Sequence, residues 1–145
     1  MIKESREKNR LLIADDSKMN RKILKEILGD EYIVTEAKDG TEAIELLKKE
    51  EDSFSALLLD LNMPETNGYQ VLEWMNEEYV IERIPVIVIL AEDNHENIEK
   101  AYELGAMDYF TYPFDMFEIQ KRVAGTLNLY KKYENLIMAS KQVIY

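Results

Sequence analysis

Five short apolar runs recur along the chain, each bounded by polar residues. Two of them, residues 56–61 and 85–91, are apolar at nearly every position and lack the alternation of a sheet with one wet face. Continuous runs of this length are typical of strands covered on both faces. We predict five β-strands in the segments Arg10–Asp16, Tyr32–Ala37, Ala56–Leu61, Pro85–Ala91 and Asp108–Tyr112.

Helical patterns separate these runs. The first keeps its apolar residues on one face and stops at Gly29, a C-cap signal. Asp39 and Glu42 have the spacing of a capping box at the start of the second. Gly105 marks the end of the fourth. We predict helices over Ser17–Leu28, Asp39–Glu50, Tyr69–Glu77 and Asn94–Leu104, and a last helix that opens at Asp115 and Glu118.

Strand and helix therefore alternate five times along the chain. This order predicts an α/β fold with a doubly wound, five-stranded parallel sheet, right-handed crossovers and helices on both faces. The flavodoxin-like strand order 2-1-3-4-5 is the expected arrangement. In that order the first and third strands are neighbours, and ligands bind at the carboxyl ends of the strands where the order reverses.

The last helix is longer than a helix that only covers a sheet. Beyond residue 118 there is no proline, and apolar positions recur in alternating steps of four and three, as in a coiled coil. Two interpretations stay open: a helix that projects and self-associates, or an amphipathic helix folded back on the domain. The first stripe comprises Ile119, Val123, Thr126, Tyr130, Tyr133, Ile137, Ser140 and Ile144, and a second, overlapping stripe comprises Leu129, Leu136 and Val143.

Composition narrows the function. The chain has 145 residues, 46% of them hydrophobic, which suits one folded domain. Its formal net charge of -11 disfavours nucleic-acid binding, because phosphates would be repelled. The absence of cysteine excludes disulfides and thiol chemistry. The N-terminus is too polar for a signal peptide and no apolar stretch is long enough to span a bilayer, so we expect a cytoplasmic protein without a membrane partner.

Acidic residues end two of the predicted strands. Asp15 and Asp16 follow the first run, and Asp60 ends the third. Because these strand ends are neighbours in the expected order, the carboxylates converge at the ligand-binding edge. Like charges this close repel each other, and a hard divalent cation with oxygen ligands, Mg²⁺, resolves the repulsion. The competing interpretation is that each aspartate merely ends a strand or that Asp16 or Ser17 caps the first helix.

An aspartate beside Mg²⁺ can also attack phosphorus and form an acyl phosphate. The sequence has neither G-x-x-x-x-G-K-S/T nor G-x-G-x-x-G, so nothing supports nucleotide binding. A phosphatase of the haloacid dehalogenase type requires a second aspartate where this chain has Asn62. The lone histidine, His95, lies in a polar stretch, and we expect it to be exposed.

Several blocks resemble the receiver domain of two-component response regulators: LLIADDSKMNRKIL, LLLDLNMPETNGYQVL, IPVIVILAE and GAMDYFTYPFD. The resemblance covers about residues 9–128. It implies that a sensor histidine kinase or phosphotransfer protein donates a phosphoryl group, and that any chemistry is limited to Mg²⁺-dependent transfer to the domain itself. The implied roles are Asp60 as phosphoacceptor, Asp15 and Asp16 as metal ligands, Asn62 as a ligand through its backbone carbonyl, Met63, Pro64 and Gly68 as the adjoining loop, and Tyr109 as the aromatic switch.

Two positions depart from the family pattern. Leu90 stands where the family usually has threonine or serine, and Tyr112 where it usually has lysine. Leucine donates no hydrogen bond to a phosphoryl group, and tyrosine offers at most one neutral hydroxyl if it points inward. Two hypotheses follow: a receiver that is phosphorylated on Asp60 and switches in a non-standard way, or a pseudo-receiver that acts as an interaction module without phosphorylation.

The resemblance also suggests a role for the C-terminal helix. We expect a receiver domain over residues 1–128 and a helical extension over 129–145 that leads to an output domain. We further expect a homodimer, formed through the face made by the fourth helix, fifth strand and fifth helix, or through the C-terminal helix.

Overall fold

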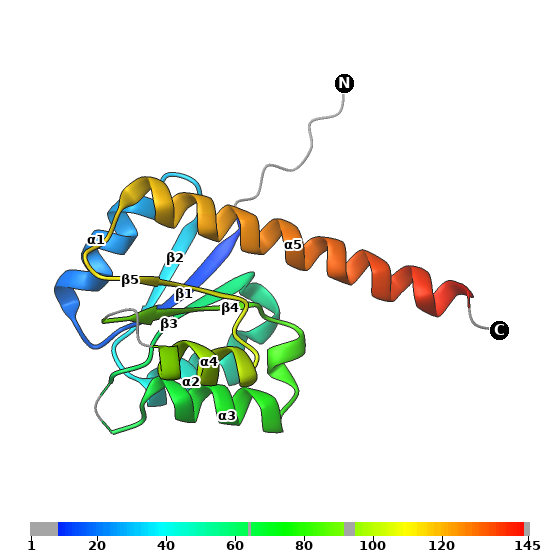
Figure 1. Cartoon of the computed structure of the whole chain (residues 1–145), viewed down its shortest axis with the longest axis horizontal. Helices are drawn as coiled ribbons and strands as arrows, with labels where there is room; N and C mark the ends of the chain where they lie inside the picture. Colours follow the sequence, from blue (N-terminus) through cyan, green and yellow to red (C-terminus); the bar gives the residue numbers. More distant parts are fainter. Residues whose placement is uncertain (1–8, 64, 92–94, 144–145) are drawn as a thin grey trace.

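Five parallel strands form one sheet in the order β2-β1-β3-β4-β5 (Figure 1). The structure is a computed structural model, and it describes residues 9–63, 65–91 and 95–143. The predicted α/β class and strand order are confirmed, with each strand within two residues of its expected ends. The strands are β1 (Arg10–Ala14), β2 (Ile33–Ala37), β3 (Ala56–Asp60), β4 (Val86–Leu90) and β5 (Asp108–Thr111).

In the described residues, four α-helices and two short 3₁₀-helices connect the strands, and a fifth α-helix follows β5. Ser17 caps the first helix: its side chain accepts a hydrogen bond from the Asn20 backbone N–H. Gly29 ends that helix as expected, but in a right-handed conformation that does not require glycine. Gly105 has φ +105 and ends the fourth helix in the region that favours glycine. The helices are α1 (Lys18–Leu28), α2 (Gly40–Glu50), η1 (Glu51–Ser53), α3 (Gly68–Glu77), η2 (Val80–Glu82), α4 (His95–Glu103) and α5 (Met116–Val143).

Helices cover both faces of the sheet, with α1 and α5 on one face and α2, α3 and α4 on the other (Figure 1). Along β3, Leu57 and Leu59 join one core cluster and Leu58 joins the other, and all three side chains are fully buried. This two-sided burial explains why the run lacks alternation. Pro64, Asn94 and Ile144, which the sequence analysis assigned to a loop, a helix start and a stripe, lie outside the described residues.

Helix α5 leaves the domain as a straight, projecting helix (Figure 1). Its first turns are anchored, because Ile119 and Val123 are fully buried and Thr126 nearly so. Every residue from Lys131 to Lys141 is exposed. The interpretation that this helix folds back on the domain is therefore wrong, because no side chain among residues 131–141 is buried against it. Within the described residues, no helix is both long and apolar enough to cross a membrane.

Candidate functional site

Three carboxylates meet at the carboxyl ends of β1 and β3. Ala14 pairs with Leu59 across these strands, so the residues that follow, Asp15 and Asp60, are brought side by side. Carboxylate oxygens of Asp15, Asp16 and Asp60 lie within 4.8 Å of one another. Asp15 is fully buried and Asp60 is 3% exposed, whereas Asp16 is exposed. The predicted convergence at this edge is confirmed.

Local donors hold the two buried aspartates in place. Asp15 Oδ1 accepts a hydrogen bond from the Ser17 backbone N–H at 2.8 Å, and its Oδ2 accepts one from Asn20 Nδ2 at 3.3 Å. Arg21 donates to the backbone carbonyl of Asp15 at 2.7 Å. Asp60 Oδ1 accepts the Asn62 backbone N–H at 3.0 Å. The start of α1 and the loop after β3 therefore set the orientation of both carboxylates.

Burial and like charge make these carboxylates hard to ionise. The pKa of Asp60 is raised to about 8, mainly by burial, with the neighbouring charges of Asp15 and Asp16 adding to the effect. Burial is also the main cause that raises the pKa of Asp15. A divalent cation would remove both the repulsion and the need for a proton. Three converging carboxylates with one of them open to water fit Mg²⁺, which retains part of its hydration shell.

The loop after β3 is packed tightly against the aspartates. The Gly68 backbone N–H donates to the Leu61 carbonyl at 3.2 Å. A Cβ at Gly68 would lie 2.5 Å from the Asp60 carbonyl oxygen, so only glycine allows this approach. Thr66 ties the loop to α2, because its hydroxyl lies 2.9 Å from that of Thr41. Thr66 and Gly68 therefore tie the C-terminal side of this loop to α2 and to the end of β3.

Leu90 and Tyr112, the two positions expected to depart from the family pattern, lie at the ends of β4 and β5. Leu90 is 2% exposed and packs in the core cluster on the α2, α3 and α4 face. Tyr112 points inward, and its hydroxyl donates a hydrogen bond to Asp15 Oδ2 at 3.4 Å. Burial and the charges of Asp60 and Asp15 raise the pKa of Tyr112, so its hydroxyl stays protonated. The structure thus places a neutral donor, the Tyr112 hydroxyl, beside Asp15.

Tyr109, which the resemblance implies as the aromatic switch, is enclosed by groups that the sequence did not reveal. Tyr109 is half-buried, and the ring of Tyr102 packs against its ring edge-on, with centroids 6.3 Å apart. The Arg122 guanidinium lies 5.6 Å from the centroid of the Tyr109 ring and pairs with Asp108 at 2.7 Å. The sequence could not predict that these residues meet, because they come from three different elements, α4, β5 and α5, and no local spacing links them. His95, as expected, is exposed.

Comparison with known proteins identifies the family. The family model for the response regulator receiver domain matches residues 11–124, so the chain belongs to this family. Transcriptional regulatory protein SrrA of Staphylococcus aureus is 36% identical over 120 residues, which make up 82% of this chain and 48% of SrrA. The chain thus spans about half the length of the curated relatives it matches.

Solved structures show the same fold. The receiver domain of Francisella response regulator 1452 is 28% identical, with a TM-score of 0.74 over 86% of this chain and 98% of that one. The Vibrio cholerae chemotaxis protein CheY4 is 24% identical, with a TM-score of 0.75 over 82% of this chain and 98% of that one, and at this identity it speaks for the fold alone. The receiver family and fold that the resemblance implied are confirmed.

Proposed function

We propose that the domain accepts a phosphoryl group on Asp60 from a phosphohistidine of a sensor kinase or phosphotransfer protein. Asp15, Asp16, Asp60 and the backbone carbonyl of Asn62 would hold Mg²⁺. One observation carries the proposal: a nearly buried Asp60 lies within 4.8 Å of two further carboxylates at the edge where this fold binds ligands.

The transfer assigns a separate task to each residue. The Asn62 N–H holds Asp60 Oδ1, which leaves Oδ2 as the nucleophile. A new O–P bond forms as the P–N bond breaks, and the departing imidazole nitrogen keeps the electron pair. A bound Mg²⁺ supplies charge neutralisation for the carboxylate and the phosphoryl oxygens. Tyr112 gives one neutral hydrogen bond at this edge, about half as strong as the one a lysine would give.

The response to phosphorylation is expected to be non-standard. In the family, a hydroxyl at the Leu90 position draws its loop toward the phosphoryl group. Leu90 has no donor, and its side chain is buried among apolar neighbours. The consequence we propose is that phosphorylation proceeds while the movement of the α4, β5 and α5 face is weakened.

Labelling with a small phosphodonor tests the acceptor. The protein is incubated with Mg²⁺ and phosphoramidate, and its intact mass is measured. One added phosphoryl group is expected on the wild type and none on Asp60→Ala. No adduct on the wild type, under conditions that label an ordinary receiver, would refute the proposal. An adduct that survives Asp60→Ala would show that the acceptor is assigned wrongly.

We also propose that α5 carries self-association. The supporting observation is a row of large apolar side chains that the domain leaves uncovered beyond its edge. They include Leu129, Tyr133, Leu136 and Ile137, each at least 40% exposed. The α4, β5 and α5 face remains the alternative surface for a homodimer. The division into residues 1–128 and 129–145, with an output domain beyond, stays a prediction.

A further inference from the structure

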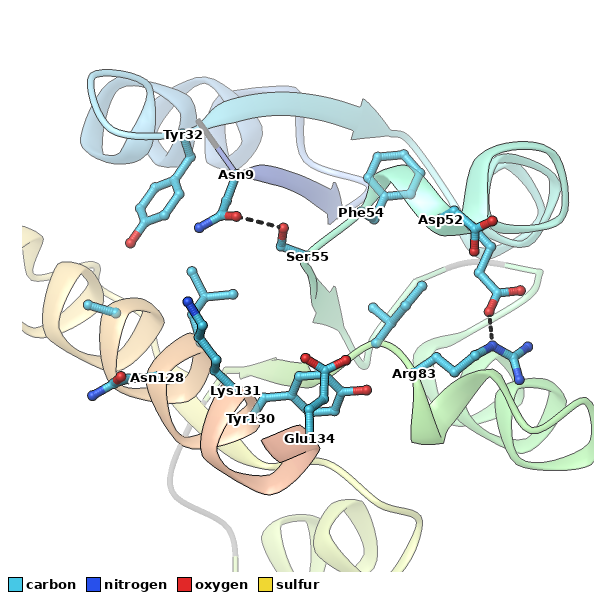
Figure 2. Close-up of a pocket in the computed structure, with 14 residues that line it drawn as sticks. Asn9, Tyr32, Asp52, Phe54, Ser55, Arg83, Asn128, Tyr130, Lys131 and Glu134 are labelled. Atoms are coloured by element: carbon cyan, nitrogen blue, oxygen red, sulfur yellow. Dashed lines mark hydrogen bonds and ion pairs between the residues drawn. The ribbon is translucent and has the colours of Figure 1, made fainter. Parts of the chain in front are cut away.

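A cleft of about 850 Å³ lies at the amino-terminal edge of the sheet, opposite the aspartates. Figure 2 shows Asn9, Tyr32 and Ser55 on one side of this cleft, with Tyr130 and Lys131 of α5 facing them. Asn9, Tyr32 and Ser55 immediately precede β1, β2 and β3 in the chain. Helix α5 therefore passes over this edge with open space beneath it, without close packing against the strands.

A single side chain bridges α5 to the far wall of this cleft. The Tyr130 hydroxyl donates a hydrogen bond of 2.6 Å to the backbone carbonyl of Glu82 in η2. Tyr130 is half-buried, and the residues that follow it to Lys141 are exposed. In the described part of the chain, this is the last hydrogen bond recorded between the α5 side chains and the domain. Burial raises the pKa of Tyr130, so the hydroxyl remains a donor at neutral pH.

The acceptor of this hydrogen bond is a fixed point. Val80 and Ile84, on either side of Glu82, are buried in the core. Arg83 forms an ion pair with Glu51 of η1, which holds the turn from outside. The turn leads into β4, which lies between β3 and β5 in the sheet and ends at Leu90. The Glu82 carbonyl is thus positioned by the sheet and not by α5.

We propose that Tyr130 is a positioning residue, a latch onto the Glu82 carbonyl that fixes the direction in which the second half of α5 leaves the domain. While this hydrogen bond is formed, the apolar stripe beyond Tyr130 keeps one orientation relative to the domain. The open cleft gives α5 room to swing when the latch is lost. The latch is one neutral hydrogen bond, so its loss shifts the ratio of the two arrangements by about two- to tenfold. The proposal does not depend on phosphorylation of Asp60.

Distance measurement by pulsed electron paramagnetic resonance tests the latch. The chain has no cysteine, so Lys49→Cys and Met138→Cys place two spin labels on exposed positions of α2 and α5. Labelled protein is diluted with unlabelled protein, so that only distances within one molecule are observed. The distance distribution is compared between this background, Tyr130→Phe and Tyr133→Phe. Tyr133 is the matched control, because it is 49% exposed and its ring packs against that of Tyr130.

The expected result is one narrow distribution in the background and in Tyr133→Phe, and a broadened or second distribution in Tyr130→Phe. The melting temperature of Tyr130→Phe should stay close to that of the background, which separates loss of the latch from loss of the fold. A distribution in Tyr130→Phe that matches the background would overturn the proposal. Equal broadening in both variants would do so as well, because it would assign the effect to the exposed helix surface and not to the hydroxyl.

Discussion

At the scale of single residues, the structure describes both the three converging aspartates and the two positions, Leu90 and Tyr112, at which we expect the chain to depart from the family pattern. Asp15 and Asp60 are buried and oriented by backbone donors, as a metal-facing nucleophile requires. Leu90 is buried among apolar neighbours, and Tyr112 reaches Asp15 with a neutral hydroxyl. We therefore expect that Asp60 can receive a phosphoryl group, whereas Leu90 and Tyr112 respond to it weakly.

Restoring the missing cation is expected to speed the transfer. Tyr112→Lys should raise the rate of labelling by phosphoramidate roughly five- to tenfold, because a charged donor stabilises the developing charge better than a neutral hydroxyl. Tyr112→Phe, which keeps the ring and loses the hydroxyl, should lower the rate. The measurement is intact mass against time. Equal rates in all three proteins would show that position 112 does not touch the reaction.

Magnesium binding is expected to strengthen with pH. The proton on Asp60 competes with the metal, so affinity should rise by up to about tenfold per pH unit and level off near pH 8, the pKa of Asp60. The pKa of Asp60 in the folded state lies above its unfolded value of about 4. The contribution of Asp60 to the free energy of unfolding is therefore fully present below pH 4 and is lost as the pH rises through 8.

Calorimetric titration with Mg²⁺ between pH 6 and 9 checks this dependence. In parallel, the metal-free protein should lose stability over that range, and Asp60→Asn should lose less. An affinity that does not change with pH would contradict a protonated Asp60 in the metal-free site.

A pair of glycine substitutions tests how closely the loop approaches Asp60. Gly68→Ala should lower the free energy of unfolding by about 1–3 kcal/mol, because its Cβ would overlap the backbone of Asp60 and Leu61. Gly125→Ala is the matched control. No atom lies within 4 Å of a Cβ built there, so it should raise that free energy by about 0.5–1 kcal/mol. Urea unfolding measures both, and two effects of the same sign would contradict the packing described.

At the scale of elements, the sequence was sufficient for the order of the sheet and for most helix starts. The run from Ala56 to Leu61 could be read as a strand because both of its faces are buried. Ser17 and Asp39 could be read as caps because capping depends on local spacing. The inward turn of Tyr112 could not be predicted, since it depends on a contact with Asp15, 97 residues away in the chain. The sequence also could not decide whether α5 projects or folds back. Its stripe is apolar along both the part that packs on the domain and the part that leaves it, so the pattern does not mark where packing ends.

The exposed half of α5 is expected to pair with a second copy. Leu136 is 70% exposed and lies on the apolar stripe. Leu136→Glu should therefore reduce the mass measured by light scattering from that of a dimer to that of a monomer. Met138→Glu adds the same charge at a position 57% exposed on the opposite side of the helix, and it should leave the dimer intact. A wild type that is monomeric at every concentration tested would exclude self-association through this helix.

At the scale of the whole molecule, the two edges of the sheet hold different groups of residues. The carboxyl edge gathers the aspartates, and the amino edge holds the turn to which Tyr130 is latched. Helix α5 packs on the sheet with its first turns and carries an uncovered stripe on its second half (Figure 1). From the formal net charge of -11 we predict that this domain binds partners with basic surfaces and does not bind nucleic acid.

The central claim is that Asp60, and no other carboxylate, receives the phosphoryl group. Borohydride reduces an aspartyl phosphate to homoserine, which marks the acceptor permanently. The protein is treated with Mg²⁺ and phosphoramidate, reduced, digested and sequenced by mass spectrometry. The account predicts homoserine at position 60 and unmodified aspartate at positions 15 and 16. Homoserine at either of those positions, or at none, would contradict it.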